Sequence, residues 1–184
     1  MCIRDRATVA LTGTPGTGKS AVARALPSSW NVIEVAELGR RLGAARRRGN
    51  GVEVDLVRLA RAFRSGSSRK VDVVVGHLAH LLPLRDVIVL RCHPEELRRR
   101  LVEAGRGSAA DRQENVVAEA TDIILLEALR LRRRVWEVDT TGRTPRSVAQ
   151  AVTERVRRRG PPSYGRVDWL SDPRVTAHLL DNKR

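Results

Sequence analysis

The sequence has few cysteines, few aromatic residues and no long hydrophobic run. Its two cysteines, Cys2 and Cys92, are too few for a disulfide framework or a cysteine-based metal site. No stretch approaches the roughly 18 consecutive apolar residues that span a bilayer. No apolar run follows the charged N-terminus as it does in a secretory signal. We therefore expect a protein of the reducing cytoplasm with no membrane partner.

Negative charge is also scarce. Against 21 acidic residues stand 35 basic ones, which gives a net charge of +14, and only Lys19, Lys70 and Lys183 are lysines. The arginine guanidinium is suited to phosphate recognition. Two interpretations stay open: a surface that lies near RNA, or arginine usage that reflects a GC-rich genome. Arginine runs occur at 46–48, 98–100, 132–134 and 157–159, and we expect three of the four on solvated helix faces.

The composition, 41% hydrophobic and 30% charged over 184 residues, is typical of one globular domain. Short β-rich runs alternate with segments of helical periodicity, which predicts an α/β protein of three layers around a mostly parallel five-stranded sheet. We expect strands at 7–12, 31–35, 71–75, 87–90 and 135–139, and helices at 20–26, 36–48, 55–63, 95–103, 111–134 and 145–159. Gly160 and two prolines then separate a domain of residues 1–160 from a tail of residues 161–184.

The segment GTPGTGKS, Gly13 to Ser20, is the most informative motif. It matches the phosphate-binding loop G-x-x-x-x-G-K-[ST] and lies between a predicted strand and a predicted helix. Glycines let backbone N–H groups point at a phosphate, and the helix N-terminus adds positive charge. Lys19 is expected at the β- and γ-phosphates of ATP, and the Ser20 hydroxyl at a Mg²⁺ ion.

The rest of the sequence restricts the class of nucleotide enzyme. The D-x-x-G sequence from Asp139 to Gly142 falls on the fifth predicted strand, and the Asn-Lys pair is at the C-terminus, so a GTPase is a poor match. The length excludes a large ATPase motor. A small phosphoryl-transfer enzyme, with a helical insert that holds the acceptor and a short arginine-bearing loop that covers the donor, fits the order of the elements.

The chain resembles the adenylate kinase isoenzyme 6 type family, P-loop nucleoside monophosphate (NMP) kinases that also act in small ribosomal subunit maturation. The resemblance extends over nearly the whole chain, and the C-terminal segment is most similar to archaeal members. The matching segments are LTGTPGTGKS (11–20), VDL (54–56), VVVGHLAHLLP (73–83), VIVLRCHPEELRRRL (87–101), ENVVAEATDIILLEA (114–128), EVDTTGRTP (137–145) and YGRVDWL (164–170).

The resemblance implies phosphate transfer between ATP and an NMP, with AMP as the favoured acceptor, and ATP hydrolysis that releases a ribosomal protein of the small-subunit platform, close to rRNA. It also implies a monomer, an NMP-binding insert at 35–63 and a lid at 104–114. The residues implied at ATP are Gly13, Gly16, Thr17, Gly18, Lys19, Ser20, Ala21 and the lid residue Arg106, with Ser20 at Mg²⁺. His77 is implied as a group that orients water or phosphate.

The sequence departs from this family at two places. The family carries an acid at the end of the third strand, where this chain has Val75. In the lid, Asp111 and Gln113 stand where the family has basic residues. Nucleotide binding is therefore expected to survive better than catalysis, and an ATP-gated ribosome assembly factor with little NMP kinase activity stays open as the alternative.

Overall fold

The computed structural model describes residues 8–49, 51–64, 71–158 and 160–181. Cys2, Lys70 and Lys183 lie outside the described residues. The five predicted strands are present as β1 (Val9–Gly13), β2 (Val32–Glu34), β5 (Val73–Val75), β6 (Asp86–Arg91) and β7 (Arg134–Asp139). They form one parallel sheet in the order β2-β5-β1-β6-β7.

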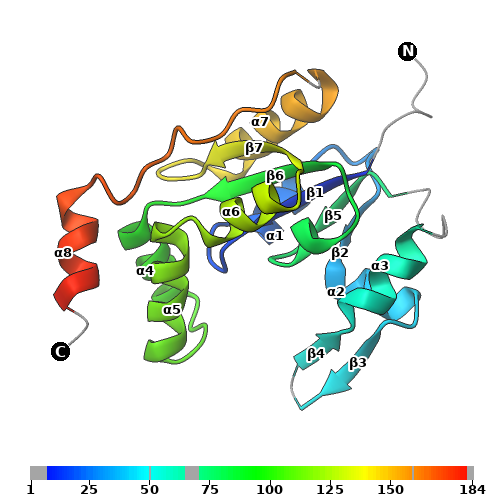
Figure 1. The fold of residues 1–184 in the computed structure, drawn as a ribbon, viewed down its shortest axis with the longest axis horizontal. Helices are drawn as coiled ribbons and strands as arrows, with labels where there is room; N and C mark the ends of the chain where they lie inside the picture. The colour runs from blue at the N-terminus through cyan, green and yellow to red at the C-terminus, as the bar shows by residue number, and fades with distance from the viewer. Residues whose placement is uncertain (1–7, 50, 65–70, 159, 182–184) are drawn as a thin grey trace.

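Helices cover both faces of the sheet, which confirms the three-layer α/β fold (Figure 1). On one face α1 (Lys19–Ala25) and α7 (Pro145–Arg158) pack against alternate strand residues such as Leu11 and Val138. On the other face α2 (Val35–Arg41), α3 (Leu56–Arg64), η2 (Ala79–Leu81) and α6 (Ile123–Arg130) cover residues such as Val74. Strands buried on both faces explain the near-continuous apolar runs of the sequence.

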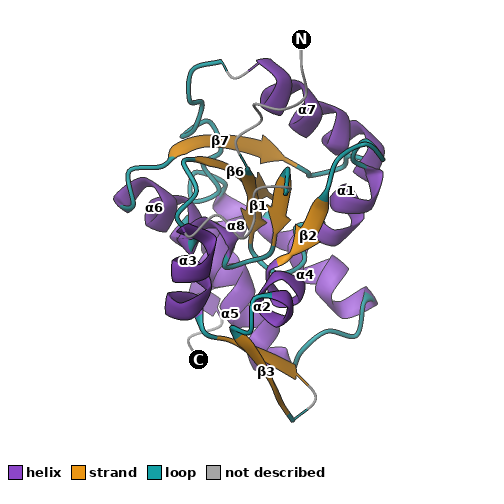
Figure 2. Cartoon of the chain, turned by 90° about the vertical axis from the view of Figure 1, so that its right-hand side faces the viewer, coloured by secondary structure: helices purple, strands orange, loops and turns teal. Residues whose placement is uncertain are grey.

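The predicted helix over 36–48 is wrong beyond Arg41. A β-hairpin of β3 (Ala45–Arg48) and β4 (Gly51–Val54) follows α2 and projects from the body of the molecule (Figures 1 and 2). Gly43, at φ 64°, ends the helix in a left-handed turn that directs the chain outward. The insert is therefore a helix, a hairpin and a second helix, α3, instead of being helical throughout.

The predicted helix over 111–134 is likewise wrong as one element. It consists of α5 (Ala109–Ala120) and α6, separated at Asp122, which has φ 58°. Among residues with a side chain, Asp is one of those that adopt this left-handed backbone most often, and the Asp122 carboxylate accepts from the guanidinium of Arg91. Because α6 ends at Arg130, the arginines at 132–134 lie in a turn and in β7. The runs at 46–48 and 132–134 are thus not helix faces.

The C-terminal segment lies against the domain. Ser163 forms a parallel bridge with Trp136, and α8 (Pro173–Asp181) follows beyond α4 (Pro94–Glu103), at the far side of the molecule from the hairpin (Figure 1). The division into a domain of residues 1–160 and a tail of residues 161–184 stays a prediction. Within the described residues, no helix combines the length and the apolar character needed to cross a membrane.

Candidate nucleotide-binding site

The loop from Gly13 to Gly18 connects the carboxyl end of β1 to the first residue of α1. Gly16 and Gly18 have φ 95° and 93°, which side chains rarely adopt. A Cβ at Gly16 would lie 2.8 Å from Cδ1 of Leu97, so any other residue there would also require the leucines of α4 to shift. Thr17 N–H donates to Thr14 O at 3.2 Å and closes the loop. This is the backbone conformation that a phosphate cradle requires.

Lys19 folds back over this loop. Its Nζ donates hydrogen bonds to the carbonyl oxygens of Gly13 at 2.7 Å and of Thr14 at 2.9 Å. Burial lowers the pKa of Lys19 to about 8; the nearby charges of Glu119 and Glu34 raise it, and that of Arg106 lowers it. Arg106 thus stands close enough to Lys19 for the two cations to repel each other, as expected where both approach one anion.

A cavity of about 670 Å³ opens above the loop, a volume in the range of small-molecule sites. The loop and α1 form one wall, the end of β5 with His77 forms the floor, and α4 with Arg106 closes one side. The ends of β2 and β4 form the wall opposite. Its lining includes the predicted site residues Gly16, Gly18, Lys19, Ser20, Ala21, His77 and Arg106.

Two predicted site residues lie beneath this surface. Gly13 is buried, and a Cβ there would come within 2.4 Å of Leu90 O. Thr17 is fully buried, and its hydroxyl donates to Thr14 O at 2.9 Å. Both residues therefore shape the loop from below, and their side chains do not line the cavity.

The two histidines after β5 have different environments. His77 lines the cavity, and burial, followed by the charges of Lys19 and His80, lowers its pKa. A largely neutral imidazole can accept or donate a hydrogen bond to water or phosphate. His80 is buried, with Nδ1 3.1 Å from the Thr12 hydroxyl and Nε2 2.9 Å from a Glu127 carboxylate oxygen. His80 holds η2 against α6 and does not reach the cavity.

Glu34 and Arg100 also line the cavity, although the sequence did not predict them there. Arg100 belongs to the run at 98–100, but its guanidinium donates to the backbone and side chain of Thr140. Helical spacing is the sequence signal for Arg100, because it lies three residues after the buried Leu97 and so near the same helix face. Glu34 ends β2, and only the pairing of the strands reveals its neighbours.

A buried charge cluster supports the loop from below. Arg91, at the end of β6, is 1% exposed and donates to Glu119 at 2.8 Å and to Glu137 at 2.5 Å, in addition to Asp122. Glu119 in turn accepts from the Thr14 hydroxyl at 2.5 Å. Trp169 of the C-terminal segment donates its indole N–H to Glu119 at 3.3 Å. The loop from Gly13 to Gly18, β6 and the C-terminal segment thus all donate hydrogen bonds to the carboxylate of Glu119 on α5.

The chain is similar to known proteins over most of its length. Residues 9–122 match the family model described as "AAA domain". Three archaeal proteins named "Putative adenylate kinase" are similar. That of Thermococcus onnurineus (strain NA1) is 37% identical over 94% of this chain and 97% of the relative. That of Pyrococcus furiosus is 39% identical over 88% and 90%. That of Archaeoglobus fulgidus is 40% identical over 89% and 92%.

Solved kinase structures share the fold. Shikimate kinase from Acinetobacter baumannii superposes with a TM-score of 0.58 at 18% identity, over 85% of this chain and 96% of that chain. A gluconokinase from Sinorhizobium meliloti 1021 superposes with a TM-score of 0.51 at 16% identity, over 84% and 94%. At these identities the likeness concerns the fold alone.

Proposed function

This chain belongs to the P-loop family described as "AAA domain" and is related to the archaeal proteins named "Putative adenylate kinase", and we propose that it transfers the γ-phosphate of ATP to a nucleoside monophosphate. The favoured acceptor is AMP, and the enzyme acts as a cytoplasmic monomer. The observation that carries the proposal is the single cavity into which Lys19, His77 and Arg106 project, with the loop glycines on one side and the 35–63 insert on the other.

The donor half of the cavity is suited to a triphosphate. The loop amides and Lys19 provide donors and positive charge for the β- and γ-phosphates, as in other P-loop enzymes. The hydrogen bonds of Lys19 to Gly13 O and Thr14 O keep its ammonium group at the loop until phosphate oxygens replace the carbonyls. Mg²⁺, held at the Ser20 hydroxyl, would neutralise charge on the phosphates.

The acceptor half is bounded by the insert. The cavity wall opposite the loop includes Val35 and Ala36 at the start of α2 and Val52 and Val54 of β4. These apolar side chains suit the flat face of a base. An acceptor placed there would direct its phosphate toward the loop, which is the in-line arrangement that phosphoryl transfer requires. The hairpin that corrects the predicted helical insert therefore belongs to the acceptor wall.

Arg106 is proposed to stabilise the charge that moves between donor and acceptor. It lies in the exposed loop between α4 and α5, on the rim of the cavity. Catalysis in this class depends on charge stabilisation and positioning far more than on covalent chemistry. His77, at the floor, is placed to orient an attacking phosphate or a water molecule by hydrogen bonding.

The test is ADP production from ATP with Mg²⁺, alone and with AMP, CMP, GMP or UMP. AMP is expected to give the largest stimulation, Lys19→Ala to abolish it, and Arg106→Ala to lower the rate by about 10²-fold or more. Arg112→Ala is the matched control, because Arg112 donates to Gly107 O within the lid and does not line the cavity. ATP turnover that no monophosphate stimulates would contradict the kinase.

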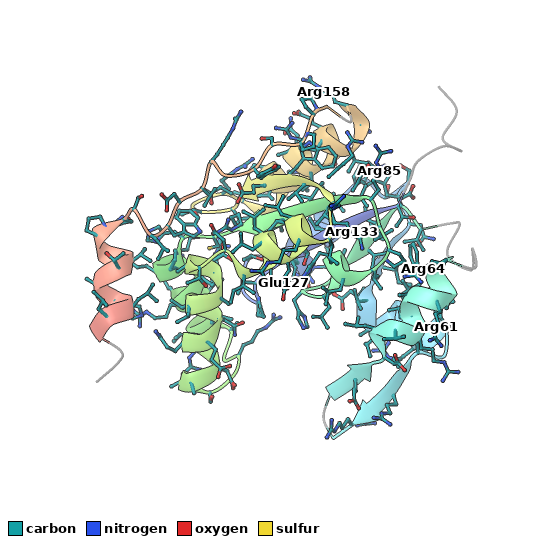
Figure 3. The ribbon with its side chains drawn as sticks, viewed as in Figure 1. Arg61, Arg64, Arg85, Glu127, Arg133 and Arg158 are labelled. Atoms are coloured by element: carbon teal, nitrogen blue, oxygen red, sulfur yellow. The ribbon has the colours of Figure 1, made fainter. Side chains whose placement is uncertain are left out.

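A second candidate is an ATP-gated factor in ribosome assembly, which releases a small-subunit ribosomal protein and lies near rRNA. The arginines at the amino ends of the strands favour it. Burial lowers the pKa of Arg133, and the nearby charge of Arg64 lowers it further. The Arg134 N–H donates to Arg85 O, so the segments before β6 and β7 lie side by side. Figure 3 shows Arg61, Arg64, Arg85 and Arg133 on this part of the molecule, away from the nucleotide loop.

This second function predicts binding to rRNA that weakens steeply with salt. The Arg64→Gln/Arg85→Gln variant should bind rRNA more weakly, while the control Arg98→Gln/Arg99→Gln, on the exposed face of α4, should bind as the wild type does. Equal binding by both variants would remove the support for this candidate. ATP-dependent release of a platform ribosomal protein, with little effect of AMP on turnover, would favour it over the kinase.

A further inference from the structure

The strands beside β1 provide no carboxylate at the nucleotide loop. P-loop enzymes hold Mg²⁺ between the loop Ser or Thr and an acid on a neighbouring strand. β5, on one side of β1, ends in Val75, which is 2% exposed. β6, on the other side, ends in Arg91, which is occupied by three acids of the buried cluster. An acid for the metal must therefore come from elsewhere.

Glu34 lies on β2, one strand further from β1 than β5, and on the face of the sheet that α1 covers. β2 pairs with β5 so that Glu34 lies in register with Val75, and Ile33 with Val74. Ile33 and Val74 pack in the cluster on the α2 and α3 face, whereas Val75 packs with α1. Because side chains alternate along a strand, Glu34 projects on the α1 face beside Val75. There the Ser20 hydroxyl donates to Glu34 Oε1 at 3.2 Å.

The other acids near the cavity are engaged by cations or buried donors. Glu53 lines the cavity too, but its carboxylate pairs with Arg46 at 2.9 Å and with Arg48 at 3.3 Å. Glu119 lies beneath the loop and accepts from Arg91, Thr14 and the Cys92 N–H. Of the cavity-lining acids in the described part of the chain, Glu34 alone has no arginine ion pair.

We propose that Glu34 positions Mg²⁺ beside Ser20, in the role that an acid at Val75 would otherwise fill. This deepens the proposed phosphoryl transfer and rests on it. Mg²⁺ takes oxygen ligands, keeps several of its waters and needs only one or two protein groups. The hydroxyl of Ser20 and the carboxylate of Glu34, within hydrogen-bond distance of each other at the loop, match that requirement.

The position of Glu34 gives this role a distinctive signature. Its charge acts on Lys19, so it also acts on a phosphate bound at Lys19. Without metal, the carboxylate repels the triphosphate, and with Mg²⁺ it attracts the bound cation. Removal of the charge should therefore weaken binding of Mg²⁺-ATP and leave binding of metal-free ATP unchanged or tighter. A residue that merely supports the fold would weaken both.

The experiment measures ATP affinity by titration calorimetry in Mg²⁺ and in excess EDTA, for the wild type and for Glu34→Gln. The wild type should bind ATP more tightly with Mg²⁺. Glu34→Gln should reduce that gain by at least about tenfold, the usual cost of losing a group that orients a metal's ligands. Mn²⁺ binding in the presence of a non-hydrolysable ATP analogue, followed by electron paramagnetic resonance, should weaken in parallel.

Glu53→Gln is the matched control, because it removes a carboxylate from the same cavity and should keep the Mg²⁺-dependent gain. In the double variant Glu34→Gln/Val75→Glu, an acid returns to the same face of the neighbouring strand and should restore the gain. An unchanged gain in Glu34→Gln, or a wild type that binds ATP equally well without Mg²⁺, overturns the proposal while ATP binding stands. A wild type that binds no ATP overturns the proposed function and this inference with it.

Discussion

The hydroxyl of Thr14 in the nucleotide loop donates a 2.5 Å hydrogen bond to Oε2 of Glu119, a buried residue 105 positions further along the chain. Both side chains are 2% exposed, so water cannot replace either partner. Glu119 also accepts from Arg91, from the Cys92 N–H and from the Trp169 indole. The loop is therefore anchored to the same carboxylate that holds β6, α5 and the C-terminal segment together.

Replacing Thr14 by Val should destabilise the fold. The variant keeps the side-chain volume but leaves a buried carboxylate oxygen without this donor, which costs about 1–3 kcal/mol. Urea unfolding measures the loss. The control is Thr153→Val in α7, where the lost hydroxyl donates only to Ala149 O within its own helix, and a change of about 0.5 kcal/mol or less is expected. Equal losses in the two variants would show that Glu119 does not need the Thr14 hydroxyl.

Replacing Arg91 by Met should destabilise the protein far more. Met fills much of the same space but leaves Glu119, Glu137 and Asp122 without their shared cation. Removing one partner of a buried ion pair costs about 3–5 kcal/mol, and here the carboxylates of Glu119 and Glu137 would stay buried without it. Urea unfolding of the variant checks this value.

Arg99→Gln is the comparison for Arg91. Its partner Glu103 is an exposed neighbour on the same helix, and such a pair contributes about 0.3–0.5 kcal/mol. If Arg91→Met were as stable as Arg99→Gln, the buried cluster would contribute little to the fold.

The affinity for ATP should fall as the pH rises above about 8. Lys19 has its pKa lowered to about 8 by burial, so it is charged below that pH and neutral above it. Bound phosphates favour the charged form, so binding above pH 8 must take up a proton and weakens by up to about tenfold per pH unit. Calorimetry in buffers of different ionisation enthalpy would detect the uptake.

A Lys19→Arg variant provides the control for this pH effect. Its guanidinium stays charged throughout the range, so its affinity, whatever its value, should not change between pH 7 and pH 9. A parallel decline in both proteins would assign the titration to another group.

Cys92 should be inert in the native protein. It is fully buried, and burial raises the pKa of its thiol to about 12, whereas only the thiolate reacts with thiol reagents. In a Cys2→Ser variant, which leaves Cys92 as the one thiol, labelling at pH 8 should occur only at the rate at which the β6–α4 region opens. Addition of urea beyond the unfolding midpoint should give full labelling, and rapid labelling without urea would contradict the buried position.

The sequence by itself determined the local features. The five parallel strands follow from short apolar runs, and their order along the chain indicated the α/β layers. The loop from Gly13 to Ser20 was predictable because its conformation depends on its own glycines and on the helix that follows. The cavity does contain Lys19, Ser20, His77 and Arg106, although their roles stay predictions. Each of these inferences used residues close together in the chain.

Only the tertiary structure decided the remainder. Apolar spacing over 36–48 and 111–134 is compatible with helices. In the structure a left-handed turn at Gly43 follows the first helix, and the left-handed residue Asp122, which accepts from Arg91, separates α5 from α6. The burial of Arg91 is equally invisible in a chain rich in exposed arginines. Glu34 and Ser20 become neighbours because β2 pairs with β5 and α1 packs above them. Strand order, the pairing of particular strands and the burial of individual charges depend on long-range contacts, which the local periodicity of the residues does not determine.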